Sequence, residues 1–484
     1  MDKFLDTLYN WVCTANSYAA DYILVILLVG TGVFFTFKTK FVQIRCFGEG
    51  MKRVFGNLSL KGGKQHGGLS SFQALATAIA AQVGTGNIVG ACGAILVGGP
   101  GAIFWMWVIA FFGMATIYAE AVLAQKTRQV DENGNVAGGP VYYIRKAFKG
   151  GFGKFLAGFF AVAIVLALGF MGTMVQSNSI GESVNTATGI APWIIGIVIV
   201  VVAGAIFLGG VNRIASVTEK LVPIMAVIYL LGGLIIIGVR IKYIPETIGM
   251  IFKYAFNPAA IIGGGIGAAL KSAISQGAKR GLFSNEAGMG STPHAHALAK
   301  VDKPHDQGVV AMAGVFIDTF VVLTMTALIV ISCLYAGNGP LSSVDGTAAA
   351  VAGGLGKTNM VQSAVEIAFT NLMGAGIAAK VGAIFVAVCL FFFAFSTILG
   401  WNLFGKINFE YLFGKKAVVV YSVLALVFIF LGSCLKNDLV WELTDFFNYL
   451  MVIPNVIALF ALNKLVRDES KEAAALKKAA KANK

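Results

Sequence analysis

Eleven apolar segments, each about long enough to cross a lipid bilayer, dominate this sequence of 484 residues. A bilayer core about 30 Å thick needs about 20 apolar residues in a helix. We place the segments at residues 19–37, 71–97, 99–124, 156–181, 191–209, 216–239, 259–283, 309–335, 377–403, 417–434 and 439–463. Only 12% of the residues are charged, about half the share found in soluble proteins, which excludes a water-soluble chain. The sequence therefore predicts an all-α integral membrane protein with about 11 transmembrane helices in the lipid bilayer.

The distribution of Lys and Arg orients these segments. Loops on one side of the predicted membrane carry 28 of the 37 Lys and Arg residues, whereas loops on the other side carry 6. Positively charged loops remain on the cytoplasmic side. We therefore predict a plasma-membrane protein with its N-terminus outside and its basic tail, residues 465–484, in the cytoplasm. The net charge of +14 follows from this topology, so we expect no nucleic-acid partner.

Two of the apolar segments contain polar, small-residue interruptions. The second segment contains AAQVGTGN at residues 80–87, and the seventh contains KSAISQG at residues 271–277. Interruptions of this kind free backbone groups that lipid cannot hydrogen-bond, so they persist only where protein or water covers them. Two broken helices at matching positions of inverted halves are typical of a transport site. The alternative is that the small residues only allow close helix packing.

The positions of the interruptions divide the chain into repeats. Without the first segment ten remain, and one interruption opens each half of five. Because five is odd, the two halves insert with opposite orientation. We predict an N-terminal helix with a basic loop at 1–64, a five-helix repeat at 65–240, a second repeat at 241–464 and a tail at 465–484.

The cysteine and histidine residues do not indicate a metal site. The six cysteines form no CxxC pair, and most lie in or near apolar segments. His294 and His296, with His305 nearby, have no cysteine or carboxylate at zinc spacing in the sequence. Because of these positions, we expect no structural disulfides between the cysteines. The segments also lack an HExxH motif or paired aspartates, so we expect no intramembrane enzyme.

Two longer motifs resemble the signatures of the alanine-or-glycine:cation symporters. Residues 98–107 read GGPGAIFWMW, and residues 280–291 read RGLFSNEAGMGS. Together with the eleven-segment pattern, the resemblance covers nearly the whole chain. It implies sodium- or proton-coupled uptake of glycine and alanine, on the inverted five-plus-five fold of the bacterial leucine transporter.

The wider fold is also similar at the interruptions. Residues 84–87, GTGN, resemble the Gly-x-Gly-Asn of the first broken helix in neurotransmitter-type sodium symporters. Residues 275–277, SQG, resemble the Ser-x-Gly of their second broken helix, and Ser396-Thr397 resembles the Thr-Ser pair of their eighth core helix in reversed order. Gln82 and Gln276 stand where those relatives are apolar, a departure that affects side-chain contacts to the substrate more than backbone contacts.

The first interruption offers groups that suit the carboxylate of an amino acid. A helix that begins near Ile88 presents the backbone amides of Thr85, Gly86 and Asn87 at its positive end, where we place the carboxylate. A side chain at Gly84 or Gly86 would hold the ligand away from this backbone.

The ammonium group needs oxygen acceptors. Backbone carbonyls near Ala273 and Ser275, or the side-chain oxygen of Gln82, would supply them. Phe170 either caps the pocket or packs in the core. The complete predicted substrate-binding set is Gln82, Thr85, Gly86, Asn87, Phe170, Ala273, Ser275 and Gln276.

A sodium ion needs about five or six oxygen ligands. The resemblance implies that the carbonyls of Ala80, Val83 and Phe393 join the hydroxyls of Ser396 and Thr397. The alternative for both hydroxyls is a hydrogen bond to the preceding helical turn. This set contains no titratable group, which favours sodium over protons as the coupling ion.

Glu120 and Asp318 are carboxylates in the middle of apolar segments, where charged residues are functional candidates. We expect Glu120 to fix a helix near the first interruption. Asp318, with Asn87, is a candidate for a second cation site.

These features together predict a monomeric secondary transporter that carries sodium with glycine or alanine into the cell by alternating access. One alternative is a proton-coupled amino-acid transporter. The other is a channel, which fits less well because channels usually place symmetric subunits around a filter.

Overall fold

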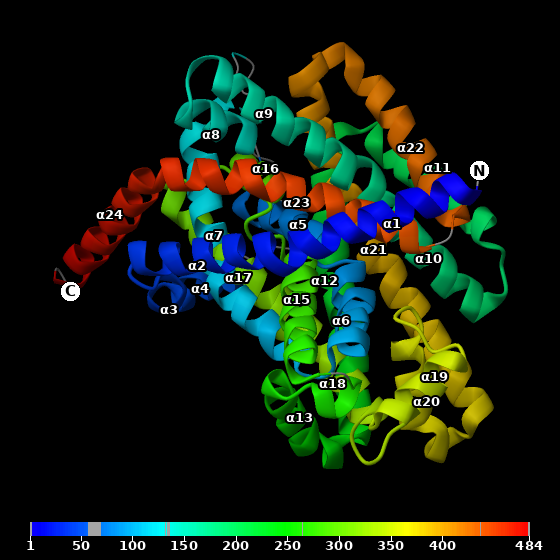
Figure 1. Ribbon diagram of the computed structural model, residues 1–484. Helices are drawn as coiled ribbons and strands as arrows, with labels where there is room; N and C mark the ends of the chain where they lie inside the picture. Colours follow the sequence, from blue (N-terminus) through cyan, green and yellow to red (C-terminus); the bar gives the residue numbers. More distant parts are fainter. Residues whose placement is uncertain are drawn as a thin grey trace.

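The computed structural model describes residues 2–56, 69–130, 132, 136–263, 265–435 and 437–482. Helices make up nearly all of this chain (Figure 1). The strands in the described ranges are β1 (Gln129–Val130) and β2 (Val136–Ala137), which form one antiparallel pair. The elements η1, η2, η3 and η5 are π-helical turns, and η4 and η6 are 3-10 turns.

The helices of the first half are α1 (Asp2–Tyr18), η1 (Ala19–Leu24), α2 (Val25–Lys38), α3 (Val42–Arg45), α4 (Phe47–Gly56), α5 (Ser71–Gln82), η2 (Gly86–Gly90), α6 (Ala91–Gly98), α7 (Ala102–Thr127), α8 (Pro140–Ala147), α9 (Gly150–Ile164), η3 (Val165–Gly172), α10 (Thr173–Thr188), α11 (Pro192–Phe207) and α12 (Gly210–Val239). The helices of the second half are η4 (Ile241–Tyr243), α13 (Ile244–Phe256), α14 (Ala259–Ile262), α15 (Ile266–Asn285), α16 (Pro293–Leu298), α17 (Pro304–Val315), η5 (Phe316–Leu323), α18 (Thr324–Leu334), α19 (Val344–Ala352), α20 (Met360–Met373), α21 (Ala375–Phe413), η6 (Lys415–Ala417), α22 (Val418–Cys434), α23 (Asn437–Ala461) and α24 (Asn463–Ala482).

The described helices include seven that are long and apolar enough to cross a membrane, or eight if the bent pair α5 and η2–α6 is one span. This confirms the all-α membrane class. Every one of the eleven predicted segments overlaps a helix of the structure, although α2 and α11 are shorter than a full span. The number eleven therefore stays a prediction, as do the repeat boundaries. The boundary at 64/65 lies outside the described residues, and the one at 240/241 falls between α12 and η4.

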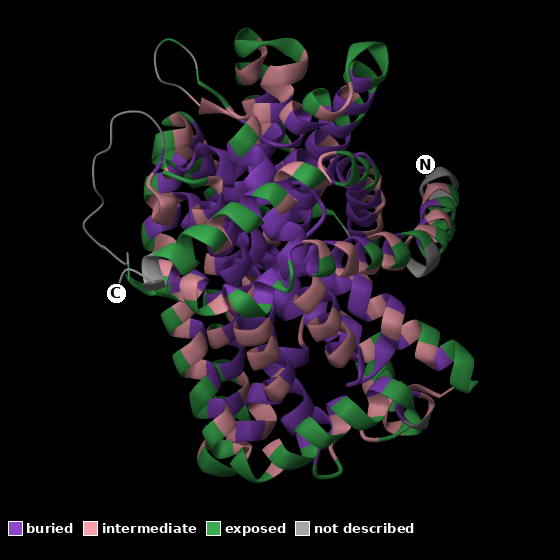
Figure 2. Ribbon diagram, turned by 90° about the vertical axis from the view of Figure 1, so that its left-hand side faces the viewer, coloured by how far each residue is buried: buried purple, intermediate pink, exposed green. Residues whose placement is uncertain are grey.

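The helices differ in how they meet their surroundings. Buried residues concentrate in the middle of the body, and exposed residues lie on its outer faces and ends (Figure 2). The outer helices α12 and α22 keep large apolar side chains exposed, for example Leu231 at 57% and Val419 at 69%. Exposed apolar surface on this scale is unfavourable in water, so these faces are suited to lipid.

The first broken helix lies where the sequence predicts it. Helix α5 begins at Ser71, directly after the N-cap residue Ser70, whose side chain forms a capping box with Gln73, and it ends at Gln82. The chain continues as η2 and α6 after a bend of 46°. The Asn87 side-chain oxygen accepts a hydrogen bond from the Gly84 amide at 3.0 Å, which replaces one bond lost from the helix. The interruption is buried, so these backbone groups are satisfied by protein.

The predicted position of the second break is wrong. Helix α15 runs without interruption through residues 271–277 and lies beside α6 (Figure 1). The small residues allow close packing instead, because a side chain on Gly277 would approach the Trp105 Cβ to 2.5 Å. Ser272 also donates a hydrogen bond to the Val97 carbonyl at 3.2 Å.

The second break lies further along the same segment. The chain leaves α15 at Glu286, which has a φ of 58°, and α16 begins at Pro293. Two broken helices are therefore present, and the interruption of the second, at residues 286–292, overlaps the end of the motif RGLFSNEAGMGS.

Candidate ion and substrate site at the broken helices

The two breaks meet although they are far apart in the sequence. The Gln82 side-chain amide, at the end of α5, donates to the Asn285 carbonyl, at the end of α15, at 2.8 Å. Both residues are buried. This contact joins the ends of α5 and α15, where the two helices are interrupted.

A cluster of five oxygen atoms lies at the end of α5. Thr397 Oγ1 lies 2.9 Å from the Ala80 carbonyl, 3.5 Å from that of Val83 and 3.1 Å from that of Phe393. Ser396 Oγ lies 2.8 Å from the Phe393 carbonyl and 3.4 Å from the Ala80 carbonyl. The structure thus brings together all five predicted sodium ligands, from α5, the break and α21.

The chemistry of this cluster suits a hard monovalent cation. Each hydroxyl bonds to the preceding turn of α21 and also contacts a carbonyl of the broken helix, so local helical bonding alone does not describe it. None of the five oxygens belongs to an ionisable side chain. The two hydroxyl protons cannot fill every lone pair on the three carbonyls, so acceptor capacity remains in the cluster. Neutral oxygens of this kind are suitable ligands for a cation of sodium's size.

Glycine at two positions of the first break allows neighbouring side chains to approach the backbone closely. A Cβ on Gly84 would overlap Thr397 Oγ1, and a Cβ on Gly86 would lie 3.0 Å from a ring carbon of Phe283. Both positions have negative φ, so steric space rather than backbone conformation requires glycine here.

The predicted carboxylate site already has protein partners. The Thr85 amide donates to the Gln176 side-chain oxygen at 3.1 Å, and the Asn87 amide contacts the Gly84 carbonyl at 3.3 Å. Within the described chain, the Gln176 side-chain nitrogen and Thr85 Oγ1 are buried without a hydrogen-bond partner. Unpartnered buried polar groups are rare and need an explanation. We missed Gln176 in the sequence, although the polar run QSNS at residues 176–179 inside an apolar segment is a usable signal.

A second polar cluster surrounds Asp318, at the start of η5. One of its carboxylate oxygens accepts from the Asn87 side chain at 2.6 Å, and the other accepts from Ser284 at 2.9 Å and Thr319 at 2.8 Å. Asn87 therefore links the first break to Asp318, as the sequence suggested. The contacts are hydrogen bonds from protein donors, and the second cation site stays a prediction.

Carboxylates hold the second break in place. Glu120 on α7 accepts hydrogen bonds from the amides of Gly288 and Gly290 at 3.1 and 3.0 Å, and from Asn455 at 2.6 Å. The sequence placed Glu120 near the first break, which is wrong, because that prediction lacked the true position of the second one. Glu286, which we did not single out, accepts from Trp401 and Ser291.

Four predicted substrate residues do not reach the breaks. Ala273, Ser275 and Gln276 belong to the intact part of α15, and Ala273 and Gln276 lie against Gly98 at the end of α6. The freed carbonyls assigned to Ala273 and Ser275 are therefore wrong. Phe170 stacks on Phe428 with ring centroids 4.6 Å apart, in a small separate apolar cluster, which matches core packing.

Two interrupted helices that meet beside a cluster of neutral oxygens define a class of membrane protein, the secondary transporters with broken helices. Comparison with known proteins agrees. The chain belongs to the sodium:alanine symporter family, whose model matches residues 5–484. The family and its relatives are transporters and not enzymes, which confirms the predictions that this chain is a transporter and that it is not an enzyme.

Individual relatives cover nearly the whole chain. The sodium/alanine symporter AgcS of Methanococcus maripaludis is 42% identical over 95% of this chain and 96% of its own length. The probable sodium/glutamine symporter GlnT of Bacillus subtilis is 38% identical over 96% of this chain and 91% of its own length.

Solved structures share the fold at low sequence identity. The structure of MhsT with L-phenylalanine has a TM-score of 0.58 at 14% identity, covering 82% of this chain and 90% of that one. A manganese transporter of Eremococcus coleocola has a TM-score of 0.52 at 14% identity, covering 82% and 78%. These likenesses confirm the fold expected from the resemblance.

Proposed function

We propose that this protein carries sodium together with a small neutral amino acid, alanine or glycine, into the cell by alternating access. The observation that carries the proposal is the cluster of five oxygens from Ala80, Val83, Phe393, Ser396 and Thr397. Because the cluster joins the broken helix to α21, an ion bound there would stabilise one arrangement of these two elements.

One sodium ion per substrate is enough for accumulation. A monovalent cation that crosses a potential of 100 mV releases about 2.3 kcal/mol. At about 1.4 kcal/mol per tenfold change, this supports a substrate gradient of roughly 40-fold. The sodium concentration gradient would add to this value.

The break also supports a small substrate. We place the substrate carboxylate beside Thr85 and Gln176, whose unpartnered polar atoms would gain partners on binding. Phe283 lies against Gly86 and packs on Trp401, with ring centroids 5.7 Å apart. Aromatic rings this close to the backbone favour the methyl group of alanine or the hydrogen of glycine over a longer side chain.

Proton coupling is the second candidate, and one observation favours it. Three buried carboxylates, Glu120, Glu286 and Asp318, lie at or next to the breaks, and such groups are typical of proton pathways. Their many hydrogen bonds from protein donors fit a structural role better. We also propose the orientation predicted from the charges, with the N-terminus outside and α24 in the cytoplasm.

Uptake into proteoliposomes tests this proposal. Purified protein should accumulate labelled alanine and glycine when sodium is outside, and uptake should stop when choline replaces sodium at constant pH. A pH gradient without sodium should drive no uptake. Uptake that follows the pH gradient would favour the proton-coupled alternative, and stronger competition by glutamine than by alanine would contradict the assigned substrate.

A further inference from the structure

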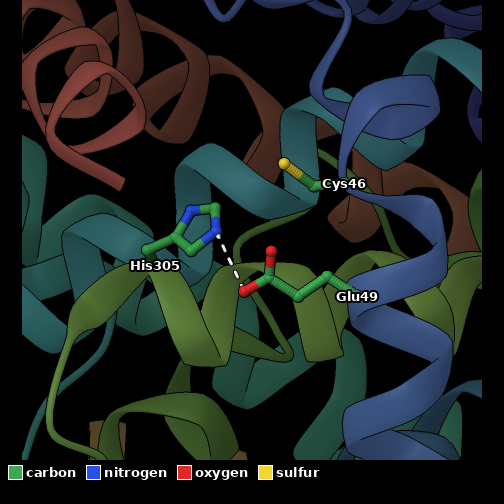
Figure 3. Close-up of side chains that lie close together, drawn as sticks. All are labelled: Cys46, Glu49 and His305. Carbon is green, nitrogen blue, oxygen red and sulfur yellow. Dashed lines mark ion pairs between the residues drawn. The ribbon is translucent and has the colours of Figure 1, made fainter. Parts of the chain in front are cut away.

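A cysteine, a glutamate and a histidine meet at the start of α17, away from the broken helices. Cys46 and Glu49 lie at and near the start of α4, and His305 lies in the first turn of α17 (Figure 3). One potential ligand atom from each residue lies within 4.8 Å of the others. Figure 3 shows the three side chains pointing toward a common space. His305 Nε2 lies 3.6 Å from Glu49 Oε1.

We propose that Cys46, Glu49 and His305 form a binding site for a divalent transition-metal ion of the zinc class. A thiolate, an imidazole and a carboxylate together are ligands that zinc accepts, and three protein ligands leave a fourth position for water. A tetrahedral ion with bonds of about 2.0–2.3 Å holds its ligands about 3.5 Å apart. The separation of 3.6 Å between His305 Nε2 and Glu49 Oε1 matches this geometry, and the Cys46 sulfur lies within 4.8 Å of a ligand atom of each.

The surroundings of His305 prepare it for metal binding. Its Nδ1 forms a hydrogen bond with the Tyr118 hydroxyl at 2.8 Å, so Nε2 is the ring atom that faces Glu49. A metal-bound histidine commonly has its other ring nitrogen fixed by such a partner. Tyr118 is buried on α7, which makes this orientation stable.

Basic side chains contact the Glu49 carboxylate on both of its oxygens. Lys477 contacts Oε2 at 3.3 Å, which leaves Oε1 toward His305. Arg53 lies 3.4 Å from Oε1, but its closer partner is Asp306 at 2.7 Å.

A cavity of about 620 Å³ adjoins Glu49 and His305 and provides a route for the ion. Glu49 and His305 line it together with Lys52, Asp306 and Leu476. The cavity also leaves room for the water ligand that a three-residue site requires. This site has no signature in the sequence, because Cys46 and Glu49 reach His305 through the packing of α4 on α17.

Metal binding by the full-length protein, purified in detergent without histidine tags, tests the proposal. Cobalt, as a spectroscopic substitute for zinc, should give a thiolate-to-metal charge-transfer band and the visible absorption of a tetrahedral site. Zinc should displace it at one equivalent. Zinc should also raise the thermal unfolding temperature, since a ligand that binds only the folded state stabilises it.

Three variants and one control identify the ligands. Cys46→Ser should abolish the charge-transfer band and weaken zinc binding by at least about 100-fold, and Glu49→Gln and His305→Asn should weaken binding similarly. Cys434→Ser, which removes an exposed cysteine elsewhere, should change neither property. Gel filtration confirms that each variant is folded. A band that persists in Cys46→Ser, or a wild-type protein that binds no cobalt, would overturn the proposal.

Discussion

The two broken helices meet at Gln82 and Asn285, but different chemistry stabilises them. At the first break, the five-oxygen cluster is made of neutral groups, and Gly84 and Gly86 have no room for a side chain. The second break is held by the carboxylate of Glu120, which accepts hydrogen bonds from the backbone amides of Gly288 and Gly290. Neutral oxygens whose hydrogen bonds are incomplete can bind an ion in place of those bonds. A buried carboxylate that already has all its hydrogen-bond donors loses free energy of stabilisation if those donors move away. We infer that the first break binds the cargo and that the second is a fixed support.

We expect the largest effect from removing the Glu120 carboxylate, which holds the second break. Glu120→Ala leaves two amides and Asn455 without their acceptor in a buried position. A buried donor left without its acceptor costs about 1–3 kcal/mol, so the loss of three such bonds should lower the free energy of unfolding by about 3 kcal/mol or more. Thermal unfolding in detergent measures it. A variant as stable as wild type would show that Glu120 does not support the second break.

The next largest effect tests the space at the first break. Gly84→Ala places a methyl group on Thr397 Oγ1, so it should abolish sodium-dependent alanine uptake with little loss of protein in the membrane. Gly93→Ala on α6 is the matched control, because its nearest neighbour would lie 3.7 Å away. Equal uptake by the two variants would contradict the assigned ion site.

A smaller effect separates ion binding from folding. Thr397→Val removes one ligand and keeps the side-chain shape, so the sodium concentration for half-maximal uptake should rise at least about 10-fold, as expected when a hydrogen-bonding group is lost. Thr370→Val is the control, since its hydroxyl donates to the Glu366 carbonyl in the preceding turn of α20. An unchanged sodium response would make Thr397 structural.

Gln176→Leu tests the residue that we missed in the sequence. It removes the acceptor of the Thr85 amide and the unpartnered side-chain nitrogen. We expect alanine affinity to fall by about 10-fold at saturating sodium, the effect of one polar contact. Binding titration with labelled alanine measures the change, and an affinity equal to wild type would exclude Gln176 from the substrate site.

The smallest effect concerns Gln276, which the sequence assigned to the substrate. The structure places it on an intact helix against Gly98. Gln276→Ala should therefore change alanine affinity by less than about 2-fold, since surface and packing substitutions away from a site have small effects. A larger loss in the same titration would restore the predicted role.

The structure brings predicted site residues together where one local signal was enough to single them out. Gly84 and Gly86 leave no room for a side chain beside their neighbours, and the adjacent hydroxyls of Ser396 and Thr397 supply ligands on one turn. The second break was misplaced because KSAISQG and NEAGMGS are both rich in small residues. Composition does not distinguish small residues that let two helices approach from those that end a helix.

The sequence by itself determined the membrane class, the helical content and the first break, because apolar length and small-residue spacing act locally along the chain. Only the tertiary structure decided which carboxylate supports which break, and which distant residues gather around His305. Those contacts depend on how helices pack, and a helix with small residues can pack through several faces with similar energy. The physical difference is that a break is a property of one segment, whereas a site is a property of several segments held together.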